Sequence, residues 1–325
     1  MPYSKTNIRE ESVGKCILLG MSKNKTELTL EEVKHFLRER WVQEVDAVEQ
    51  MMEGEESQAL SFECDENAYV LRINPSIEGF RKDAYAYRQF QSARIPIPRI
   101  IQIGFIDEQH GFCVAEKMPG VPLQDVDSPT IKGLLEPTAE VWLALKACDL
   151  GQTTGYGDFD VEGRGAYATW REFLLSLLDP QTYRWDRVLP PAYRETCQEV
   201  IPTFRSLVKR CPEERALVHG DFGSNNVLTD GQRITAVLDW ENAKYGDPIF
   251  DVATAYFWSP WLECMAAQAA YFETLLSAIG GYHERLVCYQ LYIGLAEVYE
   301  TAIQQKWNMT HWAMSRCVEI AHAAR

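Results

Sequence analysis

The sequence predicts an α+β fold of two lobes, in which a small antiparallel sheet is followed by a mostly helical lobe. Strand-like segments gather before about residue 118, helical spacing prevails after about residue 130, and PGVPLQDVDSPT, rich in Pro and Asp, lies between them at 119–130. With 325 residues, 46% of them hydrophobic, the chain can bury a full core. We divide it into an N-terminal extension (1–27), a first lobe (28–118) and a second lobe (119–325).

The first lobe is predicted to begin with a helix. In TLEEVKHFLRERW, Thr29 is the N-cap and Glu32 completes a capping box, with apolar residues at helical spacing behind it. AVEQMM, SQALSFEC and YVLRIN then indicate three strands in an antiparallel meander, separated by the turn residues GEE and DEN. FRKDAYAYRQFQ returns to helical spacing, and IPIPRIIQIGF and GFCVAEKM indicate two more strands. We expect a small sheet with one helix packed on it.

The second lobe is predicted to be helical at about 131–149, 169–178 and 191–210. The stretch at 217–240 is strand-like, and three long amphipathic helices are expected from about residue 261 to the end. We find no internal repeat and no low-complexity tract.

Composition excludes several classes of partner. The net charge of −15, from 32 basic and 47 acidic residues, repels phosphate backbones and anionic lipid. We therefore expect no nucleic acid and no membrane as a partner, and a cationic small molecule as the substrate. The nine cysteines are scattered without a CxxC pair, which argues against a disulfide framework or a zinc site and favours a reducing cytoplasm. The sequence leaves the oligomeric state and the role of residues 1–27 open.

The stretch LVHGDFGSNNVLTDGQRITAVLDW at 217–240 has the residues that phosphoryl transfer requires. That reaction needs a carboxylate to orient the acceptor hydroxyl and take its proton, together with oxygen ligands for magnesium ions on the triphosphate. Asp221 is our candidate for the first role, and Asn226 and Asp239 for the second. His219 is expected to support the loop. Taken singly, these could be a core histidine, a turn former and loop residues, but the joint spacing HxDxxxxN, then an apolar strand and DW, favours the functional interpretation.

The chain resembles the aminoglycoside phosphotransferases of the kinase superfamily. The resemblance is carried by GEESQALSF, YVLRIN, IPIP, DLGQTTGYG, HGDFGSNNVLTDGQRITAVLDW and FWSPWLECM, which occur in order from about residue 50 to 320. It implies a two-lobed kinase-like fold, with Asp221 as the catalytic base and Asn226 and Asp239 as ligands of Mg²⁺, two ions being expected. It also implies that ATP or GTP donates its γ-phosphate to a hydroxyl of an aminoglycoside antibiotic. Hygromycin B or a relative is the expected acceptor, and antibiotic resistance the expected outcome.

The resemblance also implies a set of nucleotide-binding residues in the first lobe. Arg72 would occupy the position of the lysine that binds nucleotide phosphates, paired with Asp83 on the following helix in preference to Glu78. The loop from Gly54 to Ser57 would cover the triphosphate, with a backbone amide near Ser57 on a phosphate oxygen. Glu116 to Met118 would form the hinge that binds the base, without indicating adenine or guanine. The alternatives are a surface ion pair of little value and a plain hairpin turn at GEES.

Residues for the acceptor are expected in the second lobe. Trp258 and Trp261, three apart on what looks like one side of a helix, offer aromatic faces for sugar rings and ammonium groups, although tryptophans are more often part of a core than of a site. Asn225 and Glu241 are close enough in sequence to the candidate metal ligands to contact the acceptor. The chain departs from the family's pattern at Ser259 and Glu241, where the resemblance predicts Arg and Ser, so the particular aminoglycoside stays open.

Two other functions remain compatible with these residues. A kinase of the same fold for a choline-like, amino-acid-like or macrolide hydroxyl would share Asp221, Asn226 and Asp239. A pseudokinase that only binds nucleotide is disfavoured, because all three chemical residues are present. Protein kinase activity is disfavoured further, because no activation segment ending in APE follows Asp239.

Overall fold

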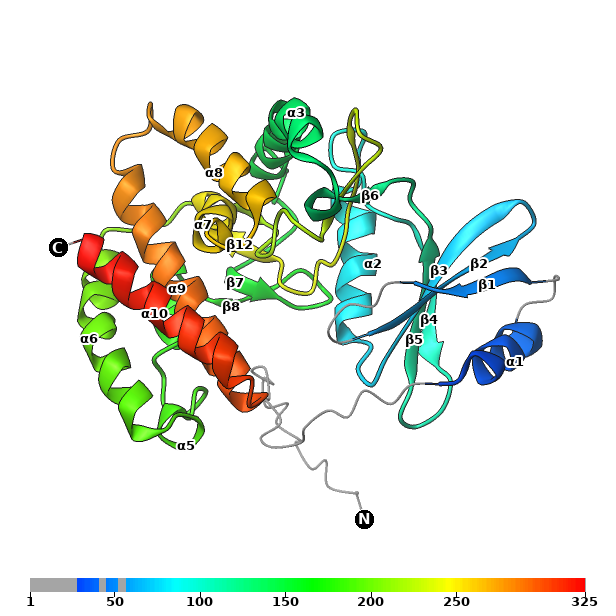
Figure 1. Ribbon diagram of the computed structural model, residues 1–325, viewed down its shortest axis with the longest axis horizontal. Coiled ribbons are helices and arrows are strands. Elements are labelled where there is room, and N and C mark those ends of the chain that lie inside the picture. The colour runs from blue at the N-terminus through cyan, green and yellow to red at the C-terminus, as the bar shows by residue number, and fades with distance from the viewer. Residues whose placement is uncertain (1–27, 41–44, 52–56, 325) are drawn as a thin grey trace, which may run out of the picture.

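The structure, a computed structural model, describes residues 28–40, 45–51 and 57–324. It has the two predicted lobes, a small one built on a sheet and a larger, mostly helical one (Figure 1). The predicted extension at 1–27 and the part of the predicted phosphate loop before Ser57 lie outside the described residues.

The first lobe is built on a five-stranded antiparallel sheet with the strand order β1-β2-β3-β5-β4. The first three strands form the predicted meander, while β4 and β5 form a hairpin whose second strand pairs with β3. We predicted that β4 would start at Ile95, but it starts at Ile100, because Pro96 and Pro98 cannot donate to a ladder. The strands are β1 (Asp46–Gln50), β2 (Gln58–Cys64), β3 (Asn67–Asn74), β4 (Ile100–Phe105) and β5 (Gly111–Glu116).

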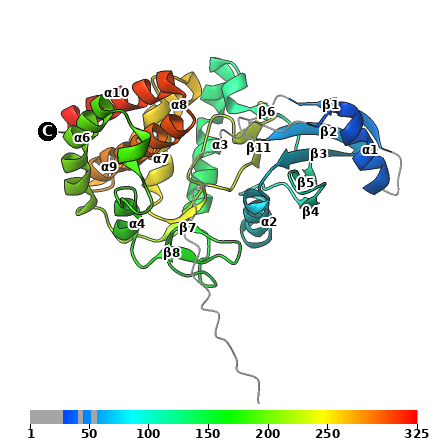
Figure 2. The same cartoon turned by 90° about the horizontal axis from the view of Figure 1, so that it is seen from below.

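Two helices cover this sheet, one on each face, where the sequence predicted one. Side chains alternate along β5, so Phe112 and Val114 lie in a core with Val33 of α1 (Leu30–Arg40), while Cys113 packs on Phe80 of α2 (Glu78–Phe90). Figures 1 and 2 both place α2 between the sheet and the second lobe. Helix α2 can therefore contact the second lobe directly.

The predicted capping box at the start of α1 is present. The Thr29 N–H donates to Glu32 Oε2 at 2.8 Å, and the Glu32 N–H donates to Thr29 Oγ1 at 3.3 Å. This reciprocal pair satisfies two N–H groups at the helix start that have no partner within the helix.

The segment between the lobes is not a plain linker. It forms a short strand, β6 (Val121–Pro122), and a 3₁₀ turn, η1 (Leu123–Asp125), before α3 starts at Ser128. β6 pairs with β10 (Val227–Thr229), which also pairs with β11 (Ile234–Val237). Gly120 has φ +109°, and a Cβ there would lie 2.2 Å from the Thr229 carbonyl oxygen, so glycine is required for this approach.

The second lobe contains more helices than the sequence predicted. The sequence analysis missed helix α7 and the short helix α5. It also missed a glycine-rich hairpin of β7 (Tyr156–Phe159) and β8 (Gly165–Tyr167). This hairpin forms a four-stranded sheet with β12 (Lys244–Gly246) and β9 (Ala216–Val218). The predicted helices at 131–149, 169–178 and 191–210 and the three after residue 261 are present with small shifts at their ends. With α5 and α7 included, the described helices of this lobe are α3 (Ser128–Lys146), α4 (Trp170–Ser176), α5 (Trp185–Val188), α6 (Pro191–Val208), α7 (Ile249–Trp258), α8 (Glu263–Leu276), α9 (Tyr282–Ile303) and α10 (Trp307–Ala323).

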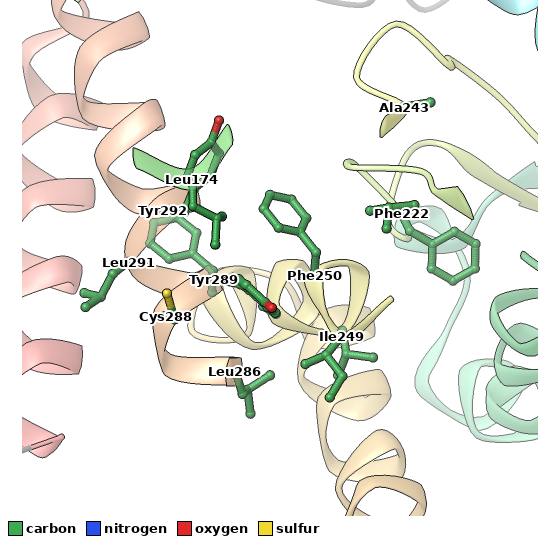
Figure 3. Packing of buried hydrophobic residues seen from close by; sticks show 14 of the residues in the cluster. Leu174, Phe222, Ala243, Ile249, Phe250, Leu286, Cys288, Tyr289, Leu291 and Tyr292 are labelled. Carbon is green, nitrogen blue, oxygen red and sulfur yellow. The ribbon is translucent and has the colours of Figure 1, made fainter. Parts of the chain in front are cut away.

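The core of the second lobe holds α7 in place. Figure 3 shows the rings of Phe250, Tyr289 and Tyr292 gathered between α7 and α9, and the ring of Phe250 lies 5.7 Å from that of Tyr289 and 5.6 Å from that of Tyr292. The fully buried Asp247 accepts from the Tyr289 hydroxyl at 2.6 Å and pairs with Arg285. These contacts fix the start of α7, which faces the central loop.

Among the described residues, no helix combines the length and the apolar character needed to cross a membrane.

Candidate functional site

The central loop joins β9 to β10 and carries the predicted base. The Asn226 side-chain Nδ2 donates to Asp221 Oδ2 at 2.7 Å and to the Asp221 backbone carbonyl at 3.0 Å. The Asn226 backbone N–H donates to the Gly223 carbonyl at 3.0 Å, which closes a turn between the two residues. The structure thus brings Asp221 and Asn226 together, and fixes one carboxylate oxygen of Asp221.

His219 supports this loop from below, as the sequence predicted. Its ring is fully buried, Nε2 lies 2.9 Å from the Leu238 carbonyl oxygen, and Nδ1 accepts from the Asp221 backbone N–H at 3.3 Å. Nε2 therefore donates and Nδ1 carries no proton. Burial lowers the pKa of His219 to about 4, so the ring is neutral at pH 7.

A second carboxylate, Asp251 on α7, was missed by the sequence analysis. Its Oδ2 accepts from the His219 N–H at 2.9 Å and its Oδ1 from the Gly220 N–H at 2.7 Å, so it holds the backbone just before Asp221. Burial raises the pKa of Asp251 to about 6, while these two N–H groups oppose the shift. An aspartate in an apolar helix gave no signal, because the helix itself was not predicted.

The predicted metal ligand Asp239 lies beside Asn226. The hairpin of β10 and β11 pairs Val227 with Val237, and the Leu238 N–H donates to the Asn226 carbonyl at 2.8 Å, so both ligands stand at the same end of the hairpin. Burial raises the pKa of Asp221 and the charge of Asp239 raises it further, which places the two carboxylates within electrostatic reach. Asp239 itself is exposed, with a left-handed backbone at φ +58°.

These side chains fit a magnesium ion. Because Asn226 Nδ2 makes both bonds to Asp221, its amide oxygen is the end that can face a cation, next to the carboxylate of Asp239. Amide and carboxylate oxygens are the hard donors that Mg²⁺ prefers, and Mg²⁺ in such sites commonly keeps water and phosphate ligands. In the described part of the chain no group of three or more His, Cys, Asp and Glu residues is arranged to hold a metal by itself.

The predicted ion pair of the first lobe is present. Arg72 on β3 pairs with Asp83 Oδ2, and its guanidinium lies 4.9 Å above the Phe80 ring. Glu78, the less favoured partner, pairs with Arg81 instead at 2.8 Å. Burial raises the pKa of Asp83, and the adjacent guanidinium opposes this shift.

Asp83 also contacts the second lobe. Its Oδ1 accepts from the backbone N–H of Trp240 at 2.8 Å, so one carboxylate links Arg72 to the residue that follows Asp239. The pair is therefore not the surface ion pair that was the alternative, since the side chain of Asp83 is only 7% exposed.

The remaining predicted nucleotide residues lie on the first-lobe sheet. Ser57 precedes β2, and its Oγ lies 3.3 Å from Asn74 Nδ2 at the end of β3. Glu116 ends β5, its N–H donates to the Arg99 carbonyl, and the next N–H, of Lys117, donates to the Ala68 carbonyl, both at 2.9 Å. Met118 follows at the start of the segment that leads to the second lobe.

Two predicted acceptor residues flank the carboxylates. Asn225 is exposed, and its Oδ1 accepts from the Ser224 hydroxyl at 2.8 Å. Glu241 is exposed as well, and its N–H lies 3.4 Å from Asp239 Oδ1. Lys244, which the sequence analysis did not single out, lies 3.4 Å from Asp158, and its charge lowers the pKa of Asp221.

The two predicted tryptophans form an aromatic cluster with a third. Trp258 ends α7, but Trp261 lies in the turn after it rather than on the same helix, since its N–H donates to the Trp258 carbonyl at 2.9 Å. Trp312 on α10, missed by the sequence analysis, stacks on Trp258 with ring centroids 5.1 Å apart and meets Trp261 edge-on at 5.0 Å. Trp261 is 52% exposed, so this cluster presents an aromatic face to solvent.

Comparison with known proteins identifies phosphotransferases by two separate routes. Residues 48–286 match the model of a family described as the phosphotransferase enzyme family. The chain is 42% identical over 299 residues to hygromycin-B 4-O-kinase from Escherichia coli, covering 92% of this chain and 87% of that protein.

Solved structures show the same fold. The chain superposes on a thermostable variant of the aminoglycoside phosphotransferase APH(4)-Ia, in ternary complex with AMP-PNP and hygromycin B, with TM-score 0.86 and 41% identity, covering 90% of this chain and 98% of that one. It also superposes on the GDP complex of aminoglycoside 2'-phosphotransferase-IIIa, with TM-score 0.64 and 15% identity, covering 93% and 99% of the two chains. The second match shows the fold alone.

Proposed function

The chain belongs to the phosphotransferase enzyme family, and from this we propose that it transfers the γ-phosphate of a magnesium nucleotide to a hydroxyl of an aminoglycoside. The observation that carries the proposal is the contact between Asn226 and Asp221, with Asp239 beside them at the end of one hairpin. Hygromycin B is the first candidate acceptor, because it is the substrate in the name of the relative with 42% identity. Modification of the drug would confer resistance on the cell.

Asp221 is the proposed catalytic base. Asn226 fixes its Oδ2, so the other carboxylate oxygen can orient the acceptor hydroxyl and take its proton as the phosphoryl group is transferred. Burial raises the pKa of Asp221, which makes the carboxylate a better proton acceptor than an exposed one.

Asn226 and Asp239 are the proposed ligands of magnesium, through the amide oxygen of one and the carboxylate of the other. We propose two ions, as is usual for kinase-like sites. When bound, magnesium neutralises charge that develops on the phosphate oxygens.

The first lobe (28–118) is the proposed nucleotide-binding unit, and the second lobe (119–325) the catalytic and acceptor-binding unit. Arg72, held by Asp83, would present its guanidinium to the phosphates. The planar array of N–H donors on Arg is well suited to bind phosphate oxygens. A backbone amide near Ser57 would bind a phosphate oxygen, and the backbone from Glu116 to Met118 would bind the base.

The acceptor is proposed to bind between Asn225, Glu241 and the cluster of Trp258 and Trp261. A polycationic antibiotic is attracted by the net charge of −15 and by aromatic faces. We propose the hydroxyl at position 4, by analogy with the named reaction of the relative, and a cytoplasmic reaction, where ATP and GTP are available.

The proposal is tested by transfer of labelled phosphate from ATP and GTP to hygromycin B and a panel of other aminoglycosides. We expect transfer to hygromycin B at the highest kcat/KM, with NMR of the product locating the phosphate. Choline, amino alcohols and macrolides serve as acceptors for the alternative kinases. Hydrolysis of nucleotide without transfer to any aminoglycoside would overturn the assignment.

A further inference from the structure

Two consecutive side chains of α2 hold the turn that follows Asp239. The Lys82 ammonium donates to the backbone carbonyls of Glu241 and Ala243, the second at 3.1 Å. The Asp83 carboxylate accepts from the Trp240 N–H at 2.8 Å. A helix of the first lobe therefore binds three backbone groups just after a proposed metal ligand of the second lobe.

Lys82 is an unusual residue at this position because it is buried. It is only 8% exposed, and its ammonium lies 4.7 Å above the ring of Phe159 in addition to its two carbonyl partners. A buried ammonium is costly unless it is hydrogen-bonded, and the carbonyls of Glu241 and Ala243 supply acceptors. Lysine side chains are usually exposed, whereas that of Lys82 is buried between α2 and the second lobe.

Helix α2 packs closely on the same turn. A Cβ at Gly79 would lie 2.8 Å from Glu241 Oε2, so the absence of a side chain at Gly79 makes room for Glu241. The first turn of α2 and Lys82, one turn later, thus contact the same few residues.

The turn needs such support, because Asp239 has an unfavourable backbone. Its φ of +58° is the left-handed conformation, which costs a non-glycine residue about 1 kcal/mol or more. The Leu238 carbonyl accepts from His219 Nε2, and the Trp240 N–H donates to Asp83, so the peptide units on both sides of Asp239 are fixed. Lys82 fixes the next carbonyls along the chain.

We infer that Lys82 is a positioning residue for phosphoryl transfer: it holds the turn Trp240–Ala243 on α2 so that the Asp239 carboxylate faces the magnesium bound with the nucleotide. The inference rests on the proposed function for the role of Asp239. It adds a contact between the lobes, distinct from the bond between Asp83 and Trp240, that couples nucleotide binding to the geometry of the metal ligand.

The test measures the gain in nucleotide affinity that magnesium gives. AMP-PNP is titrated calorimetrically into the full-length protein, once with Mg²⁺ and once with EDTA, for the wild type, Lys82→Gln and Lys82→Arg. We expect Lys82→Gln to lose roughly 10- to 100-fold of the Mg²⁺-linked gain and to keep its Mg²⁺-free affinity, as for other residues that orient a metal ligand. Lys82→Arg, which can still donate to both carbonyls, should retain most of the gain.

The matched control is Arg81→Gln, which removes one positive charge from the same helix at an exposed position paired with Glu78. We expect it to bind AMP-PNP as the wild type does under both conditions. Thermal unfolding of each variant establishes that folded protein is compared, and a second variant is used if Lys82→Gln does not fold. In that case, Lys82→Met, which also removes the ammonium, is measured in its place: a lost Mg²⁺-linked gain supports the inference, and an unchanged gain overturns it.

An unchanged gain in folded Lys82→Gln overturns the inference, and so does an equal loss with and without Mg²⁺, which would indicate a structural role only. Transfer of labelled phosphate by the wild type is measured in parallel. If the wild type phosphorylates no aminoglycoside while the gain still depends on Lys82, the proposed function fails and the positioning role stands.

Discussion

Asn226 Nδ2 donates to Asp221 at two points, the carboxylate oxygen Oδ2 at 2.7 Å and the backbone carbonyl at 3.0 Å. One amide thus fixes both the carboxylate of Asp221, the proposed base, and the shape of the loop that carries it. The oxygen of the same amide is left to face a cation, so the proposed base and a proposed metal ligand are oriented together. A change at Asn226 should therefore be visible in both catalysis and metal binding.

The first prediction concerns the base. Asp221→Asn should bind Mg²⁺–AMP-PNP nearly as the wild type does, while kcat for phosphate transfer falls by roughly 10²- to 10⁴-fold, because a general base is removed without a change in shape. Kinetics with hygromycin B and calorimetry with AMP-PNP measure the two effects. Asp230→Asn, an exposed residue in the turn after β10, is the control and should be fully active. Wild-type kcat in Asp221→Asn would show that the base lies elsewhere.

The second prediction concerns the buried ion pair. Arg72→Ala leaves Asp83 without its guanidinium, and should lower the free energy of unfolding by about 3–5 kcal/mol, since removal of one partner strands a buried charge. It should also raise the KM for nucleotide. Urea denaturation and steady-state kinetics measure these effects. Arg81→Ala breaks an exposed pair with Glu78 and should cost about 1 kcal/mol or less, so equal losses in both variants would contradict a special role for Arg72.

The third prediction concerns pH. The pKa of His219 is about 4 in the folded protein and 6.5 when unperturbed, so the unfolded state binds a proton at a higher pH. The stabilising effect of the neutral ring is complete above about pH 6.5 and is lost as the pH falls towards 4, by about 3 kcal/mol in all. Protonation of Nδ1 would also break its bond from the Asp221 N–H.

Urea denaturation of the wild type and His219→Gln between pH 7 and 4.5 measures this difference. The wild type should lose more stability on acidification than the variant. Asp251, whose pKa is raised to about 6, contributes with the opposite sign, and the comparison removes its effect because both proteins contain it. Parallel curves for the two proteins would contradict the prediction.

The fourth prediction concerns Gly223 in the central loop. Its φ of +112° is unfavourable for alanine, and a Cβ there would lie 2.8 Å from the sulfur of Met265, so Gly223→Ala should destabilise the protein by about 1–3 kcal/mol. Met265→Ala should relieve the steric part, and the double variant should be less destabilised than the sum of the two single changes. Gly133→Ala, on α3 with nothing near its Cβ, is the control and should be neutral or stabilising.

The fifth prediction concerns the aromatic cluster. Trp261→Ala should raise the KM for the aminoglycoside by roughly fivefold, equivalent to about 1 kcal/mol for a cation on an exposed aromatic face, with little change in stability. Trp307→Ala removes another exposed tryptophan, at the start of the helix that carries Trp312, and should leave KM unchanged. An equal rise in both variants would indicate a general effect on the lobe instead.

Much of the fold follows from short-range signals in the sequence. The capping box of Thr29 and Glu32 spans three positions, and the contact between Asn226 and Asp221 spans five. Each can therefore be predicted from the spacing of residues within a short stretch of sequence. The meander β1–β3 follows from alternating side chains and turn residues. Helical spacing also placed Asp83 on the correct face of α2 for its pair with Arg72.

What the sequence did not predict depends on distant partners or on weak patterns. Lys82 contacts carbonyls 159 and 161 positions away. Every residue has a backbone carbonyl, so no pattern of residue types in the sequence can identify the partners of Lys82. Asp251 acts on N–H groups 31 and 32 positions before it. Helix α7 is buried on nearly all sides, so it shows no polar stripe, and the strands β7 and β8 are only four and three residues long.

Asp83 contacts two partners at once, the guanidinium of Arg72 and the N–H of Trp240, so the length of its side chain must suit both contacts. The two side chains therefore set one distance between β3 and α2. We expect Arg72→Lys to need Asp83→Glu to span the same distance, since either change alone leaves a gap or a clash. The summed length of the two side chains, more than the length of either, decides whether the pair forms.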